Sequence, residues 1–223
     1  MSKLERKIII TSDGSTTIQI PDWNEQYHSK HGAVQEAIHV FIKNGLTLFK
    51  NDDISILEIG FGTGLNAFIT FLEANLLKTK VDYVGVEAYP VKIDETKKLN
   101  YVDVLGATNF KQVFTKMHDV SWEEKHKLSS DFYLTKRKQY FSEITDVERF
   151  NLIYFDAFGA RVQPELWTEK IFNIMYSALK QQGVLVTYSA KGSVRRAMQA
   201  VGFTVERLPG PPGKREMLRA TKK

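Results

Sequence analysis

Residues 56–68 read ILEIGFGTGLNAF, an apolar run followed by three glycines at every second position and then by a helix-like segment. A short apolar run before a glycine-rich turn is typical of a buried strand that leads through a loop into a helix. In open α/β sheets, ligands bind beyond the carboxyl ends of such strands, where glycines let the backbone approach the ligand. The stretch therefore predicts a strand over 54–59, a ligand-binding loop over 60–64 and a helix over 65–77.

The patterns after this unit continue to alternate between strand and helix. Apolar runs predict strands over 81–86, 131–140, 152–155, 184–189, 203–208 and 216–221, and helical spacing predicts a helix over 164–179. Such alternation implies parallel pairing through crossover connections, whereas the last two runs are too close together for a crossover helix and must pair antiparallel. We therefore predict an α/β fold with a doubly wound, mostly parallel, seven-stranded Rossmann-like sheet and an antiparallel terminal hairpin.

The first fifty residues have a different pattern. Residues 7–20 read KIIITSDGSTTIQI, two β-branched runs around a turn signal, which predicts a β-hairpin. Residues 33–49 carry apolar side chains at helical spacing, which predicts a helix with one buried face. We expect residues 1–50 to form an N-terminal extension that packs on a domain of residues 51–223.

Composition excludes several classes of protein. The 223 residues include no cysteine, so disulfides and thiolate metal sites are absent, and the five histidines show no metal-ligand spacing, so we expect no metal. No apolar run approaches the roughly 20 residues that cross a bilayer, and no signal-type segment follows the charged start, so we expect a soluble cytoplasmic protein without a membrane partner. The net charge of +5 modestly favours an anionic partner such as nucleic acid.

The glycine loop favours a cationic, amino-acid-like ligand over a dinucleotide. The dinucleotide fingerprint needs glycine at position 65, which is Leu65, and the carboxylate of Glu58 would repel phosphates. S-adenosylmethionine fits better, with its ammonium near Glu58, its carboxylate near the amides that open the helix, and its ribose hydroxyls on Glu87 at the end of the next strand. The candidate cofactor-binding residues are Glu58, Gly60, Gly62, Gly64, Asn66 and Glu87. The alternative is that the glycines only form a turn and that Glu58 is a solvated charge.

Asp156 is the candidate catalytic residue. It follows the apolar run of residues 150–155, so it should lie at the carboxyl end of a strand beside the cofactor. Methyl transfer to an amine needs a free lone pair on nitrogen, and a carboxylate can orient the amine and take up its proton. The alternative is that Asp156 only orders the loop that precedes the helix at 164–179.

Basic residues should gather at the same edge of the sheet. The loop 209–215 of the terminal hairpin should overhang the pocket, and a helix should start near residue 191 on the same side. The candidate contacts for an anionic substrate are Lys191, Arg195, Arg196, Lys214 and Arg215. The alternative is a solvated basic surface, which is also how we interpret the run over 136–138.

Five segments carry a family resemblance. They are YHSKHGAVQEAIHVFI (27–42), LEIGFGTGLNAF (57–68), VGVEAYP (84–90), YFDAFGARVQPELWT (154–168) and VTYSAKGSVRRAMQAVGFTVERLPGPPGKREMLRA (186–220). In this order they resemble the methyltransferase family that completes 5-methylaminomethyl-2-thiouridine at the tRNA wobble position. That family includes the methyltransferase half of the bifunctional MnmC enzyme and stand-alone MnmD-type proteins.

The resemblance implies the class I methyltransferase fold and methyl transfer from S-adenosylmethionine to the amine of 5-aminomethyl-2-thiouridine in the tRNA anticodon loop. Asp156 matches the family's catalytic acid, and the matching segments add Tyr27, Phe61 and Ala88 to the candidate cofactor-binding residues. The bifunctional members carry a flavin-dependent oxidase domain after this part. Because the chain ends at residue 223, we expect no flavin in it and a separate enzyme that supplies the aminomethyl precursor.

The sequence departs from the family at Gln139-Tyr140, where relatives usually have Gly-Asp near the adenine. We expect Tyr140 to stack on the adenine instead. Two alternatives stay open. One is an aminopropyltransferase of the spermidine synthase type, which shares the acid after the fourth strand. The other is a non-catalytic RNA-binding module with a vestigial cofactor pocket.

Overall fold

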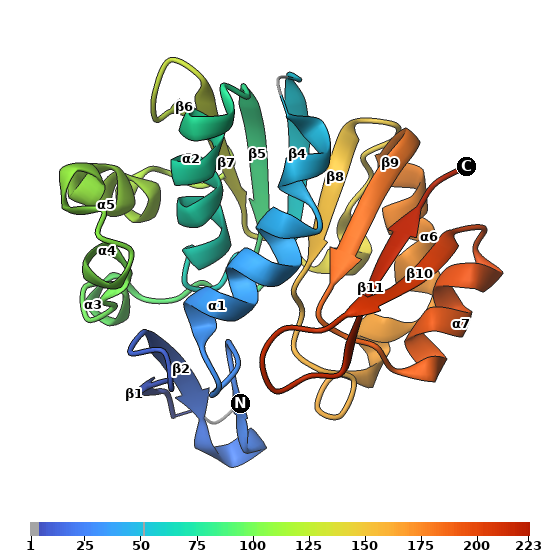
Figure 1. Ribbon diagram of the computed structural model, residues 1–223, viewed down its shortest axis with the longest axis horizontal. Helices are drawn as coiled ribbons and strands as arrows, with labels where there is room; N and C mark the ends of the chain where they lie inside the picture. Colours follow the sequence, from blue (N-terminus) through green and yellow to red (C-terminus); the bar gives the residue numbers. More distant parts are fainter. Residues whose placement is uncertain (1–4, 51) are drawn as a thin grey trace.

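The computed structural model describes residues 5–50 and 52–223. Within these residues the strands form an eight-stranded sheet of order β10-β11-β9-β8-β4-β5-β7-β6 and a small three-stranded sheet (Figure 1). The strands of the large sheet are β4 (Ile54–Ile59), β5 (Val81–Val86), β6 (Lys125–Lys127), β7 (Phe132–Arg137), β8 (Phe150–Phe155), β9 (Leu179–Thr187), β10 (Thr204–Pro209) and β11 (Glu216–Thr221).

The pairing confirms the predicted seven strands and adds an eighth. Strand β4 pairs in parallel with β5 and β8, β5 with β7, and β8 with β9, whereas β11 is antiparallel to β9 and β10. The added strand, β6, pairs antiparallel with β7 at the sheet edge. Its sequence is Lys-His-Lys, so backbone pairing rather than side-chain burial forms it, and no hydrophobic pattern marked it in the sequence.

The predicted N-terminal hairpin is present. Strands β1 (Lys7–Ile10) and β2 (Thr16–Ile20) pair antiparallel, and β3 (Glu25–Gln26) adds to β2. The turn is held by the carboxylate of Asp13, whose Oδ1 accepts hydrogen bonds from the hydroxyl of Thr11 and the backbone N–H of Ser15. A one-turn helix, η1 (Pro21–Trp23), lies between β2 and β3.

The helix expected over 33–49 is divided into three segments. These are α1 (Ala33–Ala37), the π-helical η2 (Ile38–Lys43) and η3 (Leu46–Phe49). The helix ends at Asn44, whose side-chain amide donates a hydrogen bond to the carbonyl of His39 at 2.8 Å. A Cβ at Gly45 would lie 2.5 Å from the Phe41 carbonyl oxygen, so a glycine is needed at this close approach.

Helices cover both faces of the sheet, as the doubly wound prediction requires (Figure 1). One face packs against α1, η2, α2 (Leu65–Leu77), α4 (Tyr101–Val104) and α5 (Lys111–Asp119), and the other against α6 (Glu169–Ala178) and α7 (Gly192–Ala200). Short helices α3 (Ile93–Thr96), η4 (Thr108–Phe110), η5 (Phe141–Glu143) and η6 (Pro164–Trp167) lie in the connections. In β8, Leu152 and Tyr154 belong to the first core cluster, whereas Ile153 and Phe155 belong to the second.

The N-terminal segment, residues 5–50, packs its apolar side chains into the hydrophobic core of the large sheet. Val40, Phe41 and Leu46 are buried in the same hydrophobic cluster as Ile56 of β4. Residues 1–4 and 51, which include the expected boundary between extension and domain, lie outside the described residues. Among the helices of residues 5–50 and 52–223, none is long and apolar enough to span a bilayer.

The parallel pairing brings the carboxyl ends of β4, β5, β7, β8 and β9 to one edge of the sheet. Since β10 is parallel in direction to β9, the loop 209–215 reaches this edge too. It contacts the N-terminal segment there, because the ring Nε2 of His39 lies 2.8 Å from the carbonyl oxygen of Pro209. The loops that follow the strands, the N-terminal segment and the terminal hairpin therefore meet at one end of the molecule.

Candidate functional site

The loop between β4 and α2 needs glycine for two separate reasons. Gly60 and Gly62 have φ of 92° and 48°, a region that other residues rarely adopt. A Cβ at Gly60 would also lie 2.8 Å from the backbone oxygen of Asp156, and one at Gly62 would lie 3.0 Å from the ring of Tyr27. The loop is thus packed between the end of β8 and the N-terminal segment.

A cavity of about 1710 Å³ opens beside this loop. Its lining includes eight of the ten residues predicted to bind or act on the cofactor: Tyr27, Gly60, Phe61, Gly62, Asn66, Glu87, Ala88 and Asp156. The other two, Glu58 and Gly64, lie behind the lining, and Glu58 is 1% exposed. Pockets for one small ligand typically measure about 300–1,000 Å³. The cavity is therefore large enough for two reactants.

Glu87 is fixed at the end of β5. Its carboxylate accepts hydrogen bonds from the backbone N–H of Gly62 at 3.0 Å and of Tyr89 at 2.9 Å. Burial raises the pKa of this carboxyl, and these hydrogen bonds oppose the effect. The position fits the expected contact of a carboxylate with two ribose hydroxyls.

Arg6 holds the segment that follows Glu87. Its guanidinium donates hydrogen bonds to the carbonyl of Tyr89 at 3.0 Å and to the carboxylate of Glu95 at 3.2 Å, and it also lines the cavity. Sequence reasoning missed this residue, because it lies in a charged segment with no motif. Only the fold brings it to the end of β5.

Asn66 joins two carboxylates at the first turn of α2. Its Nδ2 donates to Oε1 of Glu58 at 2.9 Å and to Oδ2 of Asp156 at 2.8 Å. Burial and, secondarily, the charge of Asp156 raise the pKa of Glu58. Burial and then the charge of Glu36 raise the pKa of Asp156 to about 7.

This cluster leaves one acceptor of a cavity-lining residue without a donor. Among the described residues, Oδ1 of Asn66 is buried and has no hydrogen-bond partner, whereas the carboxyl of Glu58 has the hydroxyl of Tyr83 beside it as a donor. Buried polar atoms are nearly always paired, so a missing donor is informative. The ammonium group of S-adenosylmethionine carries such donors, and the residues present therefore fit this cofactor.

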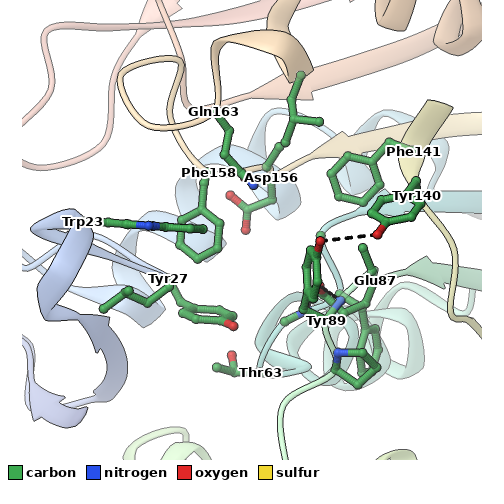
Figure 2. Close-up of a pocket in the computed structure, with 18 of the residues that line it drawn as sticks. Trp23, Tyr27, Thr63, Glu87, Tyr89, Tyr140, Phe141, Asp156, Phe158 and Gln163 are labelled. Carbon is green, nitrogen blue, oxygen red and sulfur yellow. Dashed lines mark hydrogen bonds between the residues drawn. The ribbon is translucent and has the colours of Figure 1, made fainter. Parts of the chain in front are cut away.

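Aromatic side chains form the two ends of the cavity, with Asp156 between them (Figure 2). At one end, the ring of Phe158 lies 4.9 Å from that of Tyr27 and 5.7 Å from that of Trp23, measured between centroids. Sequence reasoning missed Trp23 and Phe158. The aromatic residues near positions 23–27 were visible in the sequence, but not their proximity to Asp156.

At the other end, the exposed residues Tyr89 and Tyr140 face each other beside Glu87 and Phe141 (Figure 2). Their hydroxyl oxygens are 3.4 Å apart and their ring centroids 6.1 Å apart. Tyr140 thus lies on the side of the cavity where Glu87 is expected to hold the ribose. The contact of Tyr140 with the adenine stays a prediction.

The five basic residues proposed for an anionic substrate do not line the cavity. Lys214 forms an ion pair with Glu36, and its Nζ lies 3.9 Å from the ring centroid of Tyr188. Arg215 is exposed in the same loop, and Lys191 is exposed just before α7, which carries Arg195 and Arg196. These residues lie on the elements predicted for them, outside the lining.

The interpretation of the run over 136–138 as solvated is wrong for two of its residues. Lys136 is 1% exposed, its Nζ donates to the carbonyl of His118 at 2.6 Å, and burial lowers its pKa to about 8. Arg137 forms an ion pair with Asp146 at 2.6 Å. Lys138 is exposed and lines the cavity, as does Lys170. Because β7 is a partly buried strand, its alternation sends Lys136 inward.

No group of three or more histidine, aspartate or glutamate side chains suited to a metal ion was found in residues 5–50 and 52–223.

Comparisons with known proteins agree with this geometry. The chain is 26% identical over 231 residues to the tRNA 5-methylaminomethyl-2-thiouridine biosynthesis bifunctional protein MnmC of Burkholderia mallei, and 28% identical over 233 residues to the protein of that name from Hydrogenovibrio crunogenus. These alignments cover 95% and 96% of this chain but 34% of each relative. The chain thus spans about a third of the length of the curated relatives it matches.

Two solved structures share the fold. MnmC2 from Aquifex aeolicus superposes with a TM-score of 0.79 at 24% identity, and a spermidine synthase from Thermotoga maritima with 0.65 at 13% identity. Each comparison covers 100% of this chain and 71% of the other. At these identities the likeness establishes the class I methyltransferase fold and nothing about the substrate.

A family model described as S-adenosyl-L-methionine-dependent methyltransferase matches residues 104–223, more than half of the chain. The match includes Asp156, the loop after β8 and the terminal hairpin, and it confirms the expected class of enzyme and cofactor. The chain therefore belongs to this family of S-adenosyl-L-methionine-dependent methyltransferases.

Proposed function

We propose that the chain methylates the primary amine of 5-aminomethyl-2-thiouridine at the wobble position of tRNA, which gives 5-methylaminomethyl-2-thiouridine. The observation that carries this proposal is the carboxyl of Asp156, hydrogen-bonded to Asn66 and facing a cavity with space beyond the cofactor end. The printed names of the MnmC relatives support the choice of nucleoside. A tRNA substrate is consistent with a cytoplasmic enzyme, and in this proposal a separate enzyme supplies the aminomethyl precursor.

The cofactor-binding residues divide by chemical role. Asn66 offers its unpaired Oδ1 to the ammonium, with the carboxyl of Glu58 behind it. The backbone N–H groups of Leu65 and Asn66, which open α2, offer donors to the carboxylate. Glu87 would accept the ribose hydroxyls, with Ala88 beside it and Tyr140 against the adenine. Tyr27 and Phe61 would bound the methionine end of the site. When bound, S-adenosylmethionine supplies a methyl group on a positively charged sulfur.

Asp156 would prepare the acceptor amine. A protonated amine has no lone pair, so the site needs a group that takes a proton from nitrogen near neutral pH. A carboxyl whose pKa is about 7 suits this role, because its ionised form accepts an N–H hydrogen bond and then the proton. Asn66 holds one oxygen of the carboxylate, which leaves the other free to orient the amine.

The basic residues around the sheet edge would contact the tRNA backbone. Arg215, Lys191 and Arg196 are exposed, and cations of this kind bind phosphates without reading sequence. Lys214 is engaged by Glu36, so it would act mainly by holding the loop 209–215 in place. Arg195, which is less exposed, would complete the group from α7. In the same proposal, residues 1–50 form an extension of a catalytic domain of residues 51–223.

The test is a methylation assay on tRNA that carries 5-aminomethyl-2-thiouridine. The protein is incubated with S-adenosylmethionine, and the digested nucleosides are analysed by mass spectrometry. We expect one added methyl group on the wobble nucleoside and none on tRNA that lacks the aminomethyl group. A parallel reaction with decarboxylated S-adenosylmethionine and putrescine tests the aminopropyltransferase alternative. Product only in that reaction, or binding of tRNA without binding of S-adenosylmethionine, would overturn the proposal.

A further inference from the structure

We propose that the end of the cavity bounded by Trp23, Tyr27 and Phe158 is the acceptor site, and that it takes a planar pyrimidine ring bearing a cationic aminomethyl group. The N-terminal segment that carries Trp23 and Tyr27 is then part of the substrate-binding machinery. This inference rests on the proposed function, which it extends by assigning the residues that recognise the base.

The first argument is location. Phe158 is two residues beyond Asp156, and its ring packs edge-on against Tyr27 with an interplanar angle of 79°. Tyr27 in turn lies against Gly62, where a Cβ would come within 3.0 Å of its ring. A group at this end would therefore lie next to the glycine loop and to Asp156 (Figure 2). The opposite end, with Glu87 and Tyr140, is occupied by the nucleoside of the cofactor in the proposed arrangement.

The second argument is rigidity. Arg161 Nη2 donates to the carbonyls of Trp23 at 3.0 Å and Asn24 at 2.9 Å, and it also pairs with the carboxylate of Glu25 at 3.1 Å. On the other side, the indole N–H of Trp167 donates to the carbonyl of Phe158 at 2.7 Å. The loop after β8 is thus tied both to the N-terminal segment and to η6. A site held in this way before binding loses less entropy when a ligand enters.

The third argument is chemical class. Aromatic rings stack on nucleobases, and each such contact is worth about 1–3 kcal/mol by alanine substitution. The rings of Trp23 and Phe158 can also attract an ammonium group, and Asp156 adds a carboxyl beside them, whereas the guanidinium of Arg6 already lies over the ring of Tyr27 at 5.8 Å. Gln163 also lines the cavity near Asp156 and offers an amide to the polar edge of a base (Figure 2). A planar ring with an attached amine can contact the aromatic rings, the carboxyl of Asp156 and the amide of Gln163 at the same time.

The experiment compares Trp23→Ala with Tyr140→Ala, one aromatic residue from each end of the cavity. The probe is an anticodon stem-loop RNA with 5-aminomethyl-2-thiouridine at the wobble position. Calorimetry gives the Kd for S-adenosylmethionine and, in the presence of its demethylated product, the Kd for the RNA. Trp23→Ala should weaken RNA binding and raise the KM for RNA tenfold to a hundredfold, with the cofactor Kd changed less than threefold. Tyr140→Ala should show the reverse pattern, and Trp23→Phe should restore most of the RNA affinity.

Circular dichroism and thermal unfolding of each variant report whether it folds. If Trp23→Ala does not fold, Trp23→Leu, which keeps an apolar side chain but removes the aromatic ring, gives the result. RNA binding unchanged in the folded Trp23→Ala or Trp23→Leu variant would overturn the inference, even if turnover falls. Equal losses of RNA and cofactor affinity would also overturn it, because they would indicate a general structural role. Absence of methyl transfer by the parent protein would instead contradict the proposed function, and the binding comparison would still decide the inference.

Discussion

Burial of Asp156 favours its proton chemistry but costs folding free energy. Its pKa is raised from an ordinary value of 3.8 to about 7, mainly by burial and next by the charge of Glu36. As pH rises through this window, the unfolded chain loses the proton while the folded chain keeps it, so stability falls and the loss is complete above about pH 7. Asp156→Asn removes the cost. We expect the variant to be more stable than the parent by up to about 4 kcal/mol at pH 8.

Urea unfolding of the parent and of Asp156→Asn at pH 5 and pH 8 measures this effect. The difference should shrink to less than half at pH 5, because most of the window lies above that pH. If the difference in stability does not vary with pH, the pKa of Asp156 in the folded protein is not raised from 3.8 to about 7.

The same substitution should reduce activity. The asparagine amide cannot accept the proton of the amine, so we expect kcat to fall by about 10²–10⁴-fold. For the parent, kcat/KM should rise with pH through about 7, as the free enzyme loses the proton of Asp156. Titration calorimetry should show cofactor binding within tenfold of the parent. A variant with the parent's kcat would exclude Asp156 from the chemistry.

Gly60 and Gly14 form a matched pair for testing the glycine loop. Their φ values are 92° and 81°, so an alanine at either position bears a similar conformational strain. At Gly60 the new Cβ would also meet the backbone oxygen of Asp156 at 2.8 Å, whereas at Gly14 nothing lies within 4 Å. We expect Gly60→Ala to lower stability by about 1–3 kcal/mol more than Gly14→Ala. It should also weaken cofactor binding, measured by calorimetry, and equal effects of the two substitutions would refute the proposed contact.

At the scale of elements, the spacing of apolar residues predicted the bounds of a helix best where the helix is buried and a glycine precedes it. The helix predicted over 65–77 has those bounds, because Gly64 precedes it with φ of 71° and its apolar side chains face the sheet. The edge strand β6 was missed, since its residues carry no hydrophobic pattern. The break at Asn44 was missed too, because Ile42 and Leu46, which lie on either side of it, are four residues apart, as in a continuous helix.

The loop between β10 and β11 is attached to α1 through one ion pair. Glu36 is 8% exposed and accepts from Lys214 and from the backbone N–H of Ser29. Removing one partner of a partly buried pair leaves the other without compensation, whereas removing both avoids that cost. We expect Glu36→Gln to lower the free energy of unfolding by about 1–3 kcal/mol, and the double variant with Lys214→Met to lose less than the sum of the single losses.

The double-mutant cycle gives this coupling from the unfolding of the parent, the two single variants and the double variant. A coupling free energy of about 0.5–3 kcal/mol is expected for residues in contact. Strict additivity would mean that the two side chains do not stabilise one another in solution.

At the scale of the whole molecule, the cavity is assembled from segments that are distant in sequence. The motif over 56–68 predicted one wall and the strand ending at residue 155 a second. Trp23 and Arg6 reach the cavity only because the N-terminal segment packs against the carboxyl edge of the sheet. No local pattern encodes that packing, which arises from the hydrophobic cluster shared by η2 and β4. For the same reason the sequence indicated the residues at the cofactor end of the cavity more fully than Trp23 and Phe158 at the other end.

The distribution of charge leads to a prediction about RNA binding. A net charge of +5 attracts RNA from any direction, whereas phosphate contacts act only where cations meet the backbone. Each contact with single-stranded RNA contributes about −0.7 to the slope of log K against log salt concentration. Replacing Arg196 and Arg215 by alanine should therefore make the slope shallower by about 1.4 and weaken tRNA binding.

The control replaces Lys78 and Lys80, which are exposed at the amino end of β5, at the opposite edge of the sheet. Because both double variants lose two positive charges, the control should keep the parent's slope in filter-binding titrations between 50 and 300 mM salt, roughly the range in which counterion release dominates. Equal slopes for the two double variants would mean that net charge, and not the edge that carries the cavity, governs binding.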